Sequence, residues 1–239
     1  MRRKPGAPVI ADADLRLPDS LHKMQLTPSA QRRAAGLLAI VTSASLVFQL
    51  VLALDYSFGL GRTLAAALGV FFGYFTVLTN LLVAATCACA AWAPASAPGR
   101  QLGRAPAAAG IAASITLVGL GQYFLLSDTA AIDGPQRLAD VLLHYVTPPA
   151  YVLWWWLGAR TAPLRWSHAL AWCAYPVGYF VVTLLRGELT GLYPYPFVDL
   201  AALGIEHTMA NALALLGVFA AIGLVLVALD RATRRFTSA

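Results

Sequence analysis

Charged residues are scarce in this chain. Asp, Glu, Lys and Arg make up 12% of its 239 residues, whereas 59% are hydrophobic. An ordinary soluble domain is excluded, because its surface needs more charge and its core helices do not need apolar runs of this length. The composition therefore predicts an integral membrane protein.

Cysteine is also rare, and internal repeats are missing. The three cysteines, Cys87, Cys89 and Cys173, all fall inside apolar runs. Cys87 and Cys89 are two positions apart, so on a helix they point in different directions and predict neither a disulfide framework nor a metal site. No cofactor motif is visible, and we expect no cofactor and no metal. The missing repeat disfavours a transporter built from two related halves.

Long apolar runs dominate what is present. A hydrocarbon core of about 30 Å needs roughly 20 apolar helical residues, and every backbone polar group inside it must be paired within its own helix. We therefore expect an all-α integral membrane protein in which residues 31–239 form a single six-helix transmembrane bundle, after a disordered cytoplasmic tail at residues 1–30. The expected spans are 34–54, 66–92, 106–127, 138–158, 167–186 and 208–229.

The basic residues sort by compartment. With both termini in the cytoplasm, fourteen of the 17 Lys and Arg residues fall on the cytoplasmic side, as the positive-inside rule requires. Anionic lipid headgroups there account for the net charge of +6, so we expect membrane lipids as partners and no nucleic acid. The preference for Arg over Lys, with much Ala and Gly, favours a bacterial inner membrane. The sequence indicates no oligomeric state.

The segment between the last two spans is unusual. Residues 187–207 are too apolar for a solvated loop and contain Pro194 and Pro196, which interrupt a helix. We expect this partly apolar external loop to lie in the interface or to fold back over the outer half of the bundle. The tryptophans Trp154, Trp155 and Trp156 lie toward the cytoplasmic side, where an aromatic belt is their simplest interpretation.

Polar side chains interrupt the second span. Thr76, Thr79 and Asn80 are spaced i, i+3 and i+4, which places them on one helical face. Such a face must look into the bundle, where it either forms hydrogen bonds between helices or forms a reaction site. Both interpretations stay open on these three residues alone.

His144 in the fourth span favours a reaction site. His144 lies about six residues inside the outer end of its span. Residues 63–92 are too many for one perpendicular span, and if this helix enters the membrane near Val70, Thr76 is also about six residues in. Both groups are then roughly 9 Å below the outer boundary. A neutral imidazole is the usual base that activates a hydroxyl nucleophile. Asp140, one turn before His144, can fix the imidazole tautomer as the third member of a triad does.

Further side chains can support such a reaction. A developing oxyanion needs donors, which Asn80, Thr79 or a backbone N–H can supply. Arg186 ends the fifth span and can anchor a substrate carboxylate, although such an arginine more often extends to the headgroups. His207 lies at the start of the sixth span, where it can reach the same layer.

Three segments resemble one known family. They are YFTVLTNLL at 74–82, DVLLHYVTP at 140–148, and VGYFVVTLLRGELTGLYPYPF at 177–197. In these segments the chain resembles the androgen-induced and androgen-dependent family of multi-pass membrane threonine hydrolases, which act on fatty acid esters of hydroxy fatty acids.

The resemblance implies roles for two residues. The family's functional histidine corresponds to His144, and its threonine corresponds to Thr76 when the preceding aromatic residues are matched, with Thr79 as the alternative. The second histidine of many members corresponds here to Val141. The implied activity is an intramembrane lipid ester hydrolase acting on a fatty-acid ester. The alternatives are a non-enzymatic lipid- or solute-binding or transport protein, and a structural membrane subunit.

Overall fold

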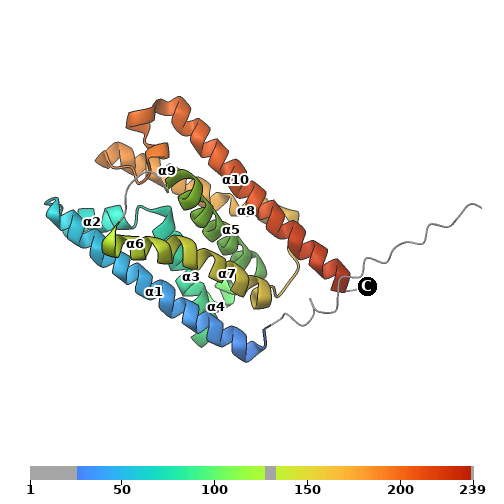
Figure 1. Ribbon diagram of the computed structural model, residues 1–239. Coiled ribbons are helices and arrows are strands. Elements are labelled where there is room, and N and C mark those ends of the chain that lie inside the picture. The colour runs from blue at the N-terminus through green and yellow to red at the C-terminus, as the bar shows by residue number, and fades with distance from the viewer. Residues whose placement is uncertain (1–25, 127–132, 238–239) are drawn as a thin grey trace, which may run out of the picture.

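The computed structural model describes residues 26–126 and 133–237, and this part of the chain is helical, with no strand (Figure 1). α-Helices alternate with short π-helical turns (η2 to η4) and one 3-10 turn (η5). The elements are α1 (Pro28–Gly59), α2 (Leu64–Phe71), α3 (Phe75–Trp92), α4 (Ala97–Leu102), α5 (Ala105–Gly121), η2 (Gln122–Leu126), α6 (Gly134–Val141), η3 (Leu142–Val146), α7 (Thr147–Trp154), η4 (Trp155–Ala159), α8 (Trp166–Trp172), α9 (Ala174–Thr190), η5 (Pro196–Val198) and α10 (Leu200–Thr237).

Within the described residues, 5 helices are long and apolar enough to cross a membrane. The predicted all-α membrane architecture is therefore confirmed in outline, whereas the predicted fourth span, 138–158, is not among the five. The five are Pro28–Gly59, Phe75–Trp92, Ala105–Leu126, Trp166–Thr190 and Leu200–Arg234.

The fourth predicted span is a broken helix. From α6 to η4 the chain alternates between α-helical and π-helical turns, so no single regular helix covers it. Pro148 and Pro149 lack the N–H groups that would bond the carbonyls four residues earlier. The N–H of Thr147 instead bonds the carbonyl of Leu142, five residues back, and closes a π turn around His144. Turns of this kind are frequent at functional sites.

The second predicted span is interrupted as well. α2 ends at Phe71 and α3 begins at Phe75, so the prediction of one helix over 66–92 is wrong at Phe72–Tyr74. The break, Phe72-Gly73-Tyr74, contains no charged residue and no proline, so hydropathy did not reveal it. The break creates a helix N-terminus inside the bundle, one residue before Thr76.

The bundle is flanked by its two longest helices. α1 and α10 lie on opposite sides, with α3, α5 and α7 between them (Figure 1). α1 packs along α3, and α5 contacts α3, α7 and α10, which makes α5 the central helix. The start of α1 and the end of α10 lie at the same end of the bundle (Figure 1).

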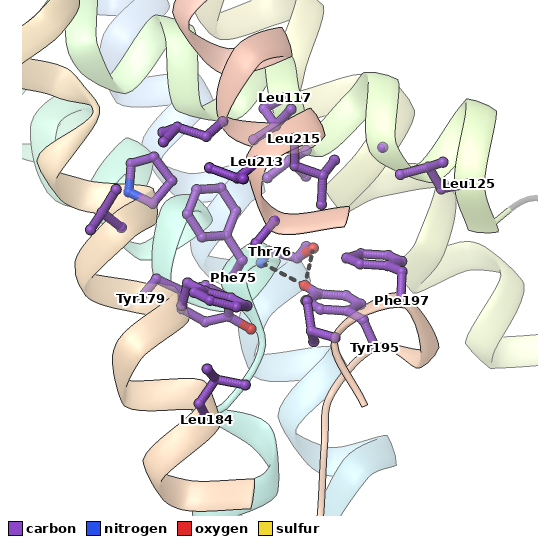
Figure 2. Close-up of a pocket in the computed structure, with 18 of the residues that line it drawn as sticks. Phe75, Thr76, Leu117, Leu125, Tyr179, Leu184, Tyr195, Phe197, Leu213 and Leu215 are labelled. Atoms are coloured by element: carbon purple, nitrogen blue, oxygen red, sulfur yellow. Dashed lines mark hydrogen bonds between the residues drawn. The ribbon is translucent and has the colours of Figure 1, made fainter. Parts of the chain in front are cut away.

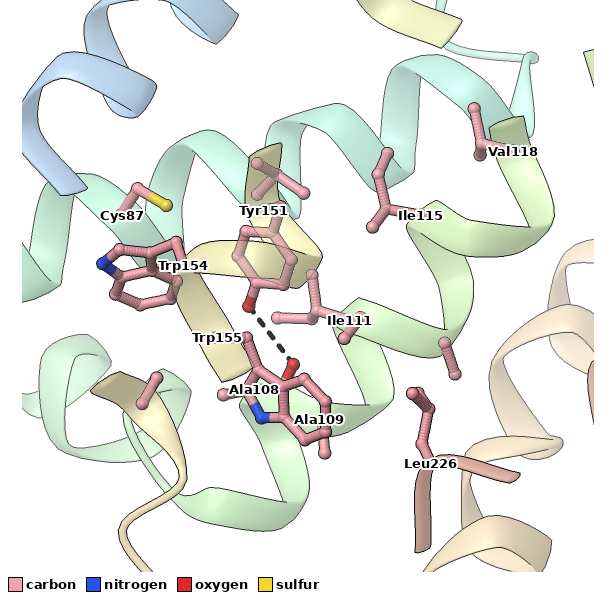
Figure 3. Close-up of a cluster of buried hydrophobic side chains, with 14 of the residues drawn as sticks. Cys87, Ala108, Ala109, Ile111, Ile115, Val118, Tyr151, Trp154, Trp155 and Leu226 are labelled. Carbon is pink, nitrogen blue, oxygen red and sulfur yellow. Dashed lines mark hydrogen bonds between the residues drawn. The ribbon is translucent and has the colours of Figure 1, made fainter. Parts of the chain in front are cut away.

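The core at that end contains the tryptophans expected in an aromatic belt. Trp154 and Trp155 are 5% and 1% exposed, so they are packed inside the bundle rather than placed around it. Tyr151 lies beside them, and its hydroxyl donates a hydrogen bond to the carbonyl of Ala108 at 3.2 Å (Figure 3). The burial of these large rings ties α7 and η4 to α5.

The ends of the predicted domain differ slightly from expectation. α1 begins at Pro28, with the hydroxyl of Thr27 accepting from the N–H of Ala30, so residues 28–30 are helical rather than part of the tail. The rest of the predicted tail, up to residue 25, lies outside the described residues. The predicted external loop 187–207 is partly helical, because α9 continues to Thr190 and α10 begins at Leu200 with a kink at Gly204.

Candidate active site

Thr76 lies at the N-terminus of α3. It is the second residue of the helix, after the extended N-cap residue Tyr74. The first N–H groups of a helix have no partner inside the helix, and this end carries the positive pole of the helix dipole. The hydroxyl and the N–H of Thr76 therefore lie where negative charge is stabilised.

His144 faces Thr76 from the π turn. Its Nε2 lies 3.2 Å from Oγ1 of Thr76. Its Nδ1 lies 3.0 Å from Oδ1 of Asp140 and 3.1 Å from the carbonyl oxygen of the same residue. Two acceptors at Nδ1 favour the tautomer that carries its proton there, which leaves Nε2 free to accept the Thr76 proton. The spacing thus matches a nucleophile, a base and an orienting carboxylate.

A close approach of α5 supports this turn. A Cβ atom on Gly119 would lie 3.2 Å from the carbonyl oxygen of His144 and 3.3 Å from Pro148. Glycine at this position therefore lets α5 pack directly against the segment that carries the imidazole. The proline break and the glycine contact together set the position of His144.

Asn80 holds the two elements together rather than facing a substrate. Its side-chain nitrogen donates to the carbonyl of Thr76 at 2.9 Å and to the carbonyl of Leu143 at 3.4 Å. Thr79 is paired with Tyr175 of α9, hydroxyl to hydroxyl, at 3.1 Å. Both are fully buried, and neither lines the two cavities described next. The expectation that Asn80 or Thr79 supplies oxyanion donors does not fit this geometry.

An apolar cavity opens on one side of Thr76 (Figure 2). It has a volume of about 600 Å³ and lies between α5, α9 and α10. Its walls are almost entirely hydrocarbon, as a lipid chain requires. Side chains around it include Leu117, Leu125, Leu184, Leu213 and Phe197.

A second, more polar cavity opens on the other side. It has a volume of about 550 Å³ and is lined by Arg62, Gln136, Asp140 and Arg186 among others. Thr76 and His144 line both cavities. Thr76 and His144 therefore lie where an apolar cavity meets a more polar one.

Arg186 lines the polar cavity, but its guanidinium already has partners. It donates to the carbonyl of Gly69 at 2.8 Å and to the carbonyl of Leu192 at 3.3 Å. A Cβ on Gly73 would fall 1.5 Å from one of its nitrogens, so the arginine lies directly over the break before α3. Arg186 thus stabilises the backbone at the break before α3. That Arg186 binds a substrate carboxylate stays a prediction. His207 is exposed and lines neither cavity, so it is not brought to the site.

Tyr195 was not among the predicted site residues. Its hydroxyl lies 3.4 Å from Oγ1 of Thr76 and 3.4 Å from the backbone nitrogen of Thr76 (Figure 2). Burial raises the pKa of Tyr195 to about 12, so the phenol stays protonated at neutral pH. The repeated Tyr-Pro pair of the external loop was the only sequence signal for Tyr195, but this motif does not indicate that Tyr195 lies against Thr76.

The described residues offer no group of three or more His, Cys, Asp or Glu side chains that could hold a metal ion. No protein-family model, curated protein or solved structure matches the chain. The resemblance to membrane threonine hydrolases therefore rests on the three sequence segments given above. The class defined by fold and site is an all-α membrane-type bundle with a buried Thr–His–Asp constellation between two cavities.

Proposed function

We propose that this protein is an intramembrane lipid ester hydrolase with Thr76 as nucleophile and His144 as general base. The observation that carries the proposal is the 3.2 Å contact between Oγ1 of Thr76 and Nε2 of His144, at the junction of the two cavities. A hydroxyl that contacts an imidazole, which in turn contacts a buried carboxylate, is the arrangement that activates a hydroxyl nucleophile.

The reaction follows from this geometry. His144 takes the proton of Thr76 as Oγ1 attacks the ester carbonyl, and it then gives the proton to the departing alkoxide. A water molecule, activated by the same imidazole, releases the acyl group as a carboxylic acid and restores Thr76. General-base assistance of this kind contributes about 10² to 10⁴-fold in rate. Asp140 keeps the imidazole oriented and stabilises it while it carries the extra proton.

The cavities favour an amphiphilic ester as substrate. The apolar cavity matches an acyl chain, and the polar cavity matches a leaving group that carries polar atoms. A fatty acid ester of a hydroxy fatty acid, the substrate implied by the family resemblance, has this character. Thr79, the alternative nucleophile, is less suited to this role than Thr76, because its hydroxyl is paired with Tyr175 outside the cavities.

The proposed setting is a bacterial inner membrane crossed six times. The helical run from Gly134 to Ala159, though irregular, supplies the sixth crossing beside the five regular helices. An even number of crossings agrees with the start of α1 and the end of α10 lying at one end of the bundle (Figure 1). The positive-inside rule assigns that end to the cytoplasm.

Covalent labelling tests the proposal. An activated alkyl fluorophosphonate is added to the purified, detergent-solubilised protein, and the labelled residue is identified by mass spectrometry. We expect labelling of Thr76 in the wild type and its loss in Thr76→Ala and His144→Ala. Thr79→Ala and His168→Ala are matched controls; each removes the same side chain at a position that lines neither cavity, and each should keep labelling.

Two results would contradict the hydrolase. Undiminished labelling in both Thr76→Ala and His144→Ala, with all variants folded, would remove the mechanism. Saturable binding of a lipid that survives Thr76→Ala, without turnover of any ester, would favour the non-enzymatic binding protein instead.

A further inference from the structure

The Tyr195 hydroxyl takes part in a chain of hydrogen bonds that runs from the N–H of Thr76 through Tyr195 and Oγ1 of Thr76 to His144. Thr76 has one hydroxyl proton, and His144 Nε2 is its acceptor in the tautomer set by Asp140. Oγ1 of Thr76 then accepts from the Tyr195 hydroxyl, and the Tyr195 oxygen accepts from the N–H of Thr76. Each donor in this chain has one acceptor, so the direction of every bond is fixed.

Packing holds the Tyr195 ring in this position. The side chain is 9% exposed, stacks on Phe197 at 5.1 Å between ring centroids, and meets Tyr74 edge to face at 5.5 Å. Pro194 and Pro196 on either side restrict the backbone of the segment. A phenol has two side-chain torsions, both of which these contacts constrain, so the phenol oxygen has a fixed position and only its O–H can rotate.

We propose that the Tyr195 hydroxyl and the Thr76 N–H form the oxyanion hole of this enzyme. The inference rests on the proposed hydrolase function and adds a catalytic residue to it. Tyr195 lines both cavities beside Thr76 and His144, which is where an ester carbonyl must lie for attack. Asn80 and Thr79 do not qualify, because the side-chain nitrogen of Asn80 donates to Thr76 and Leu143, the hydroxyl of Thr79 is paired with Tyr175, and neither residue lines the cavities.

The role follows from how the electrons move. As Oγ1 of Thr76 forms its bond to the acyl carbon, its proton passes to Nε2 of His144 and the carbonyl π electrons move onto the carbonyl oxygen. Oγ1 becomes an ester-type oxygen and a weaker acceptor, so the Tyr195 O–H turns to the new oxyanion nearby. Tyr195 donates a hydrogen bond and transfers no proton. When the C=O bond re-forms, the bond to the alkoxide breaks, and that alkoxide takes the proton from His144.

The N–H of Thr76 is the second donor. It belongs to the first turn of α3, and the hydroxyl of Tyr195 is its observed partner. Because the N–H points at the Tyr195 hydroxyl, an oxyanion that accepts from that hydroxyl lies beside the N–H as well. The helix N-terminus adds a favourable potential for negative charge at this point.

Tyr195→Phe tests the inference, with Tyr151→Phe as its matched control. Tyr151 is another buried tyrosine whose hydroxyl forms a hydrogen bond, to the carbonyl of Ala108, but it lies at the opposite end of the bundle and lines neither cavity. The substrate is a medium-chain p-nitrophenyl ester. Loss of one oxyanion donor lowers kcat by about 10² to 10³-fold, with KM little changed. Tyr151→Phe should keep kcat within about threefold of the wild type, because that hydroxyl touches no reacting atom.

Inhibitor binding distinguishes a donor from a positioning residue. An alkyl trifluoromethyl ketone forms a hemiketal with Thr76 and presents the same oxyanion as the transition state. Its affinity should fall in Tyr195→Phe by the same factor as kcat/KM. An unreactive amide of the same chain length should bind wild type and Tyr195→Phe equally, because it develops no charge.

Three other outcomes would contradict the role of Tyr195 as an oxyanion donor. Unchanged kcat and ketone affinity in Tyr195→Phe, while Thr76→Ala and His144→Ala abolish turnover, would leave the hydrolase intact and remove Tyr195 from it. Equal losses of ketone and amide affinity would make Tyr195 a structural residue of the cavity wall. A wild-type protein that neither turns over the ester nor reacts with the ketone would overturn both proposals together.

Discussion

The side-chain amide of Asn80 donates a hydrogen bond to the carbonyl oxygen of Leu143, at 3.4 Å, across two helices. The same nitrogen donates to the carbonyl of Thr76 at 2.9 Å. Because Leu143 directly precedes His144, this one side chain connects the backbone of the proposed nucleophile, Thr76, to the backbone beside the proposed base, His144. Asn80 therefore sets the spacing of the reactive pair without touching a substrate.

Asn80→Ala should weaken both stability and turnover. Removing the amide leaves the buried Leu143 carbonyl without this donor, which costs about 1 to 3 kcal/mol. A small shift of His144 relative to Thr76 should lower kcat by as much as about 10²-fold. Ser114→Ala is the control, because that hydroxyl bonds only the carbonyl of Gly110 in its own helix. Thermal unfolding in detergent and ester turnover measure the two effects, and unchanged turnover in Asn80→Ala would contradict this role.

Gly73→Ala should displace Arg186. The new Cβ would lie 1.5 Å from a guanidinium nitrogen, so the side chain must leave its acceptors on Gly69 and Leu192. Loss of these charged hydrogen bonds should lower the free energy of unfolding by about 1 to 3 kcal/mol. Gly69→Ala is the matched control, since a Cβ there meets nothing within 4 Å.

A double-mutant cycle isolates the cause of that loss. Combined with Arg186→Ala, the Gly73→Ala substitution should cost little more, because the clashing group is already absent. Denaturation midpoints of the two single variants and the double variant supply the comparison. Additive losses would mean that Gly73 is needed for its own backbone conformation rather than for the space it leaves to Arg186.

That Thr76 and His144 lie in one layer of the bundle could be predicted from the sequence. Counting residues from the outer ends of two apolar runs placed both groups in one layer, and they are in contact. The partners of the Thr79 and Asn80 side chains could not be predicted in the same way. Helical spacing put all three residues of that cluster on one side, but it does not reveal that Tyr175 covers Thr79 or that the π turn brings Leu143 to Asn80.

The break before α3 and the placement of Tyr195 were beyond sequence reasoning for a different reason. Phe72 and Tyr74 are apolar enough to continue a span, so hydropathy does not mark the break. Tyr195 reaches Thr76 through a contact across 119 positions, and periodicity within a helix carries no information about such a pairing. Trp155 was misplaced similarly, because a tryptophan near a span end fits a belt and a core equally well by composition.

The contribution of Tyr195 should be independent of pH up to about pH 10. Burial raises its pKa from 10.0 to about 12, so the folded protein holds the phenolic proton more tightly than the unfolded chain. The stabilisation from this group is complete below pH 10 and is lost as pH rises toward 12. The turnover ratio depends only on the folded-state pKa, so the ratio of wild-type to Tyr195→Phe turnover should stay constant from neutral pH through pH 10 and fall only as pH approaches about 12. A ratio that falls below pH 10 would show that the donor ionises too early for the proposed role.

If the protein is the proposed hydrolase, Ala212→Trp should shorten the acyl chains that it accepts. Ala212 lines the apolar cavity from α10, and an indole there would occupy part of its volume of about 600 Å³. A long acyl chain then loses buried contact worth about 0.8 kcal/mol for each displaced methylene, whereas a short chain that stays beside Thr76 loses little. We expect kcat/KM for a p-nitrophenyl palmitate to fall at least about tenfold relative to that for the butyrate. Ala214→Trp is the matched control, because Ala214 is exposed on the same helix and does not line the cavity. A kcat/KM for palmitate and butyrate that Ala212→Trp leaves unchanged would mean that the acyl chain does not occupy the apolar cavity, which would contradict the proposed orientation of the substrate.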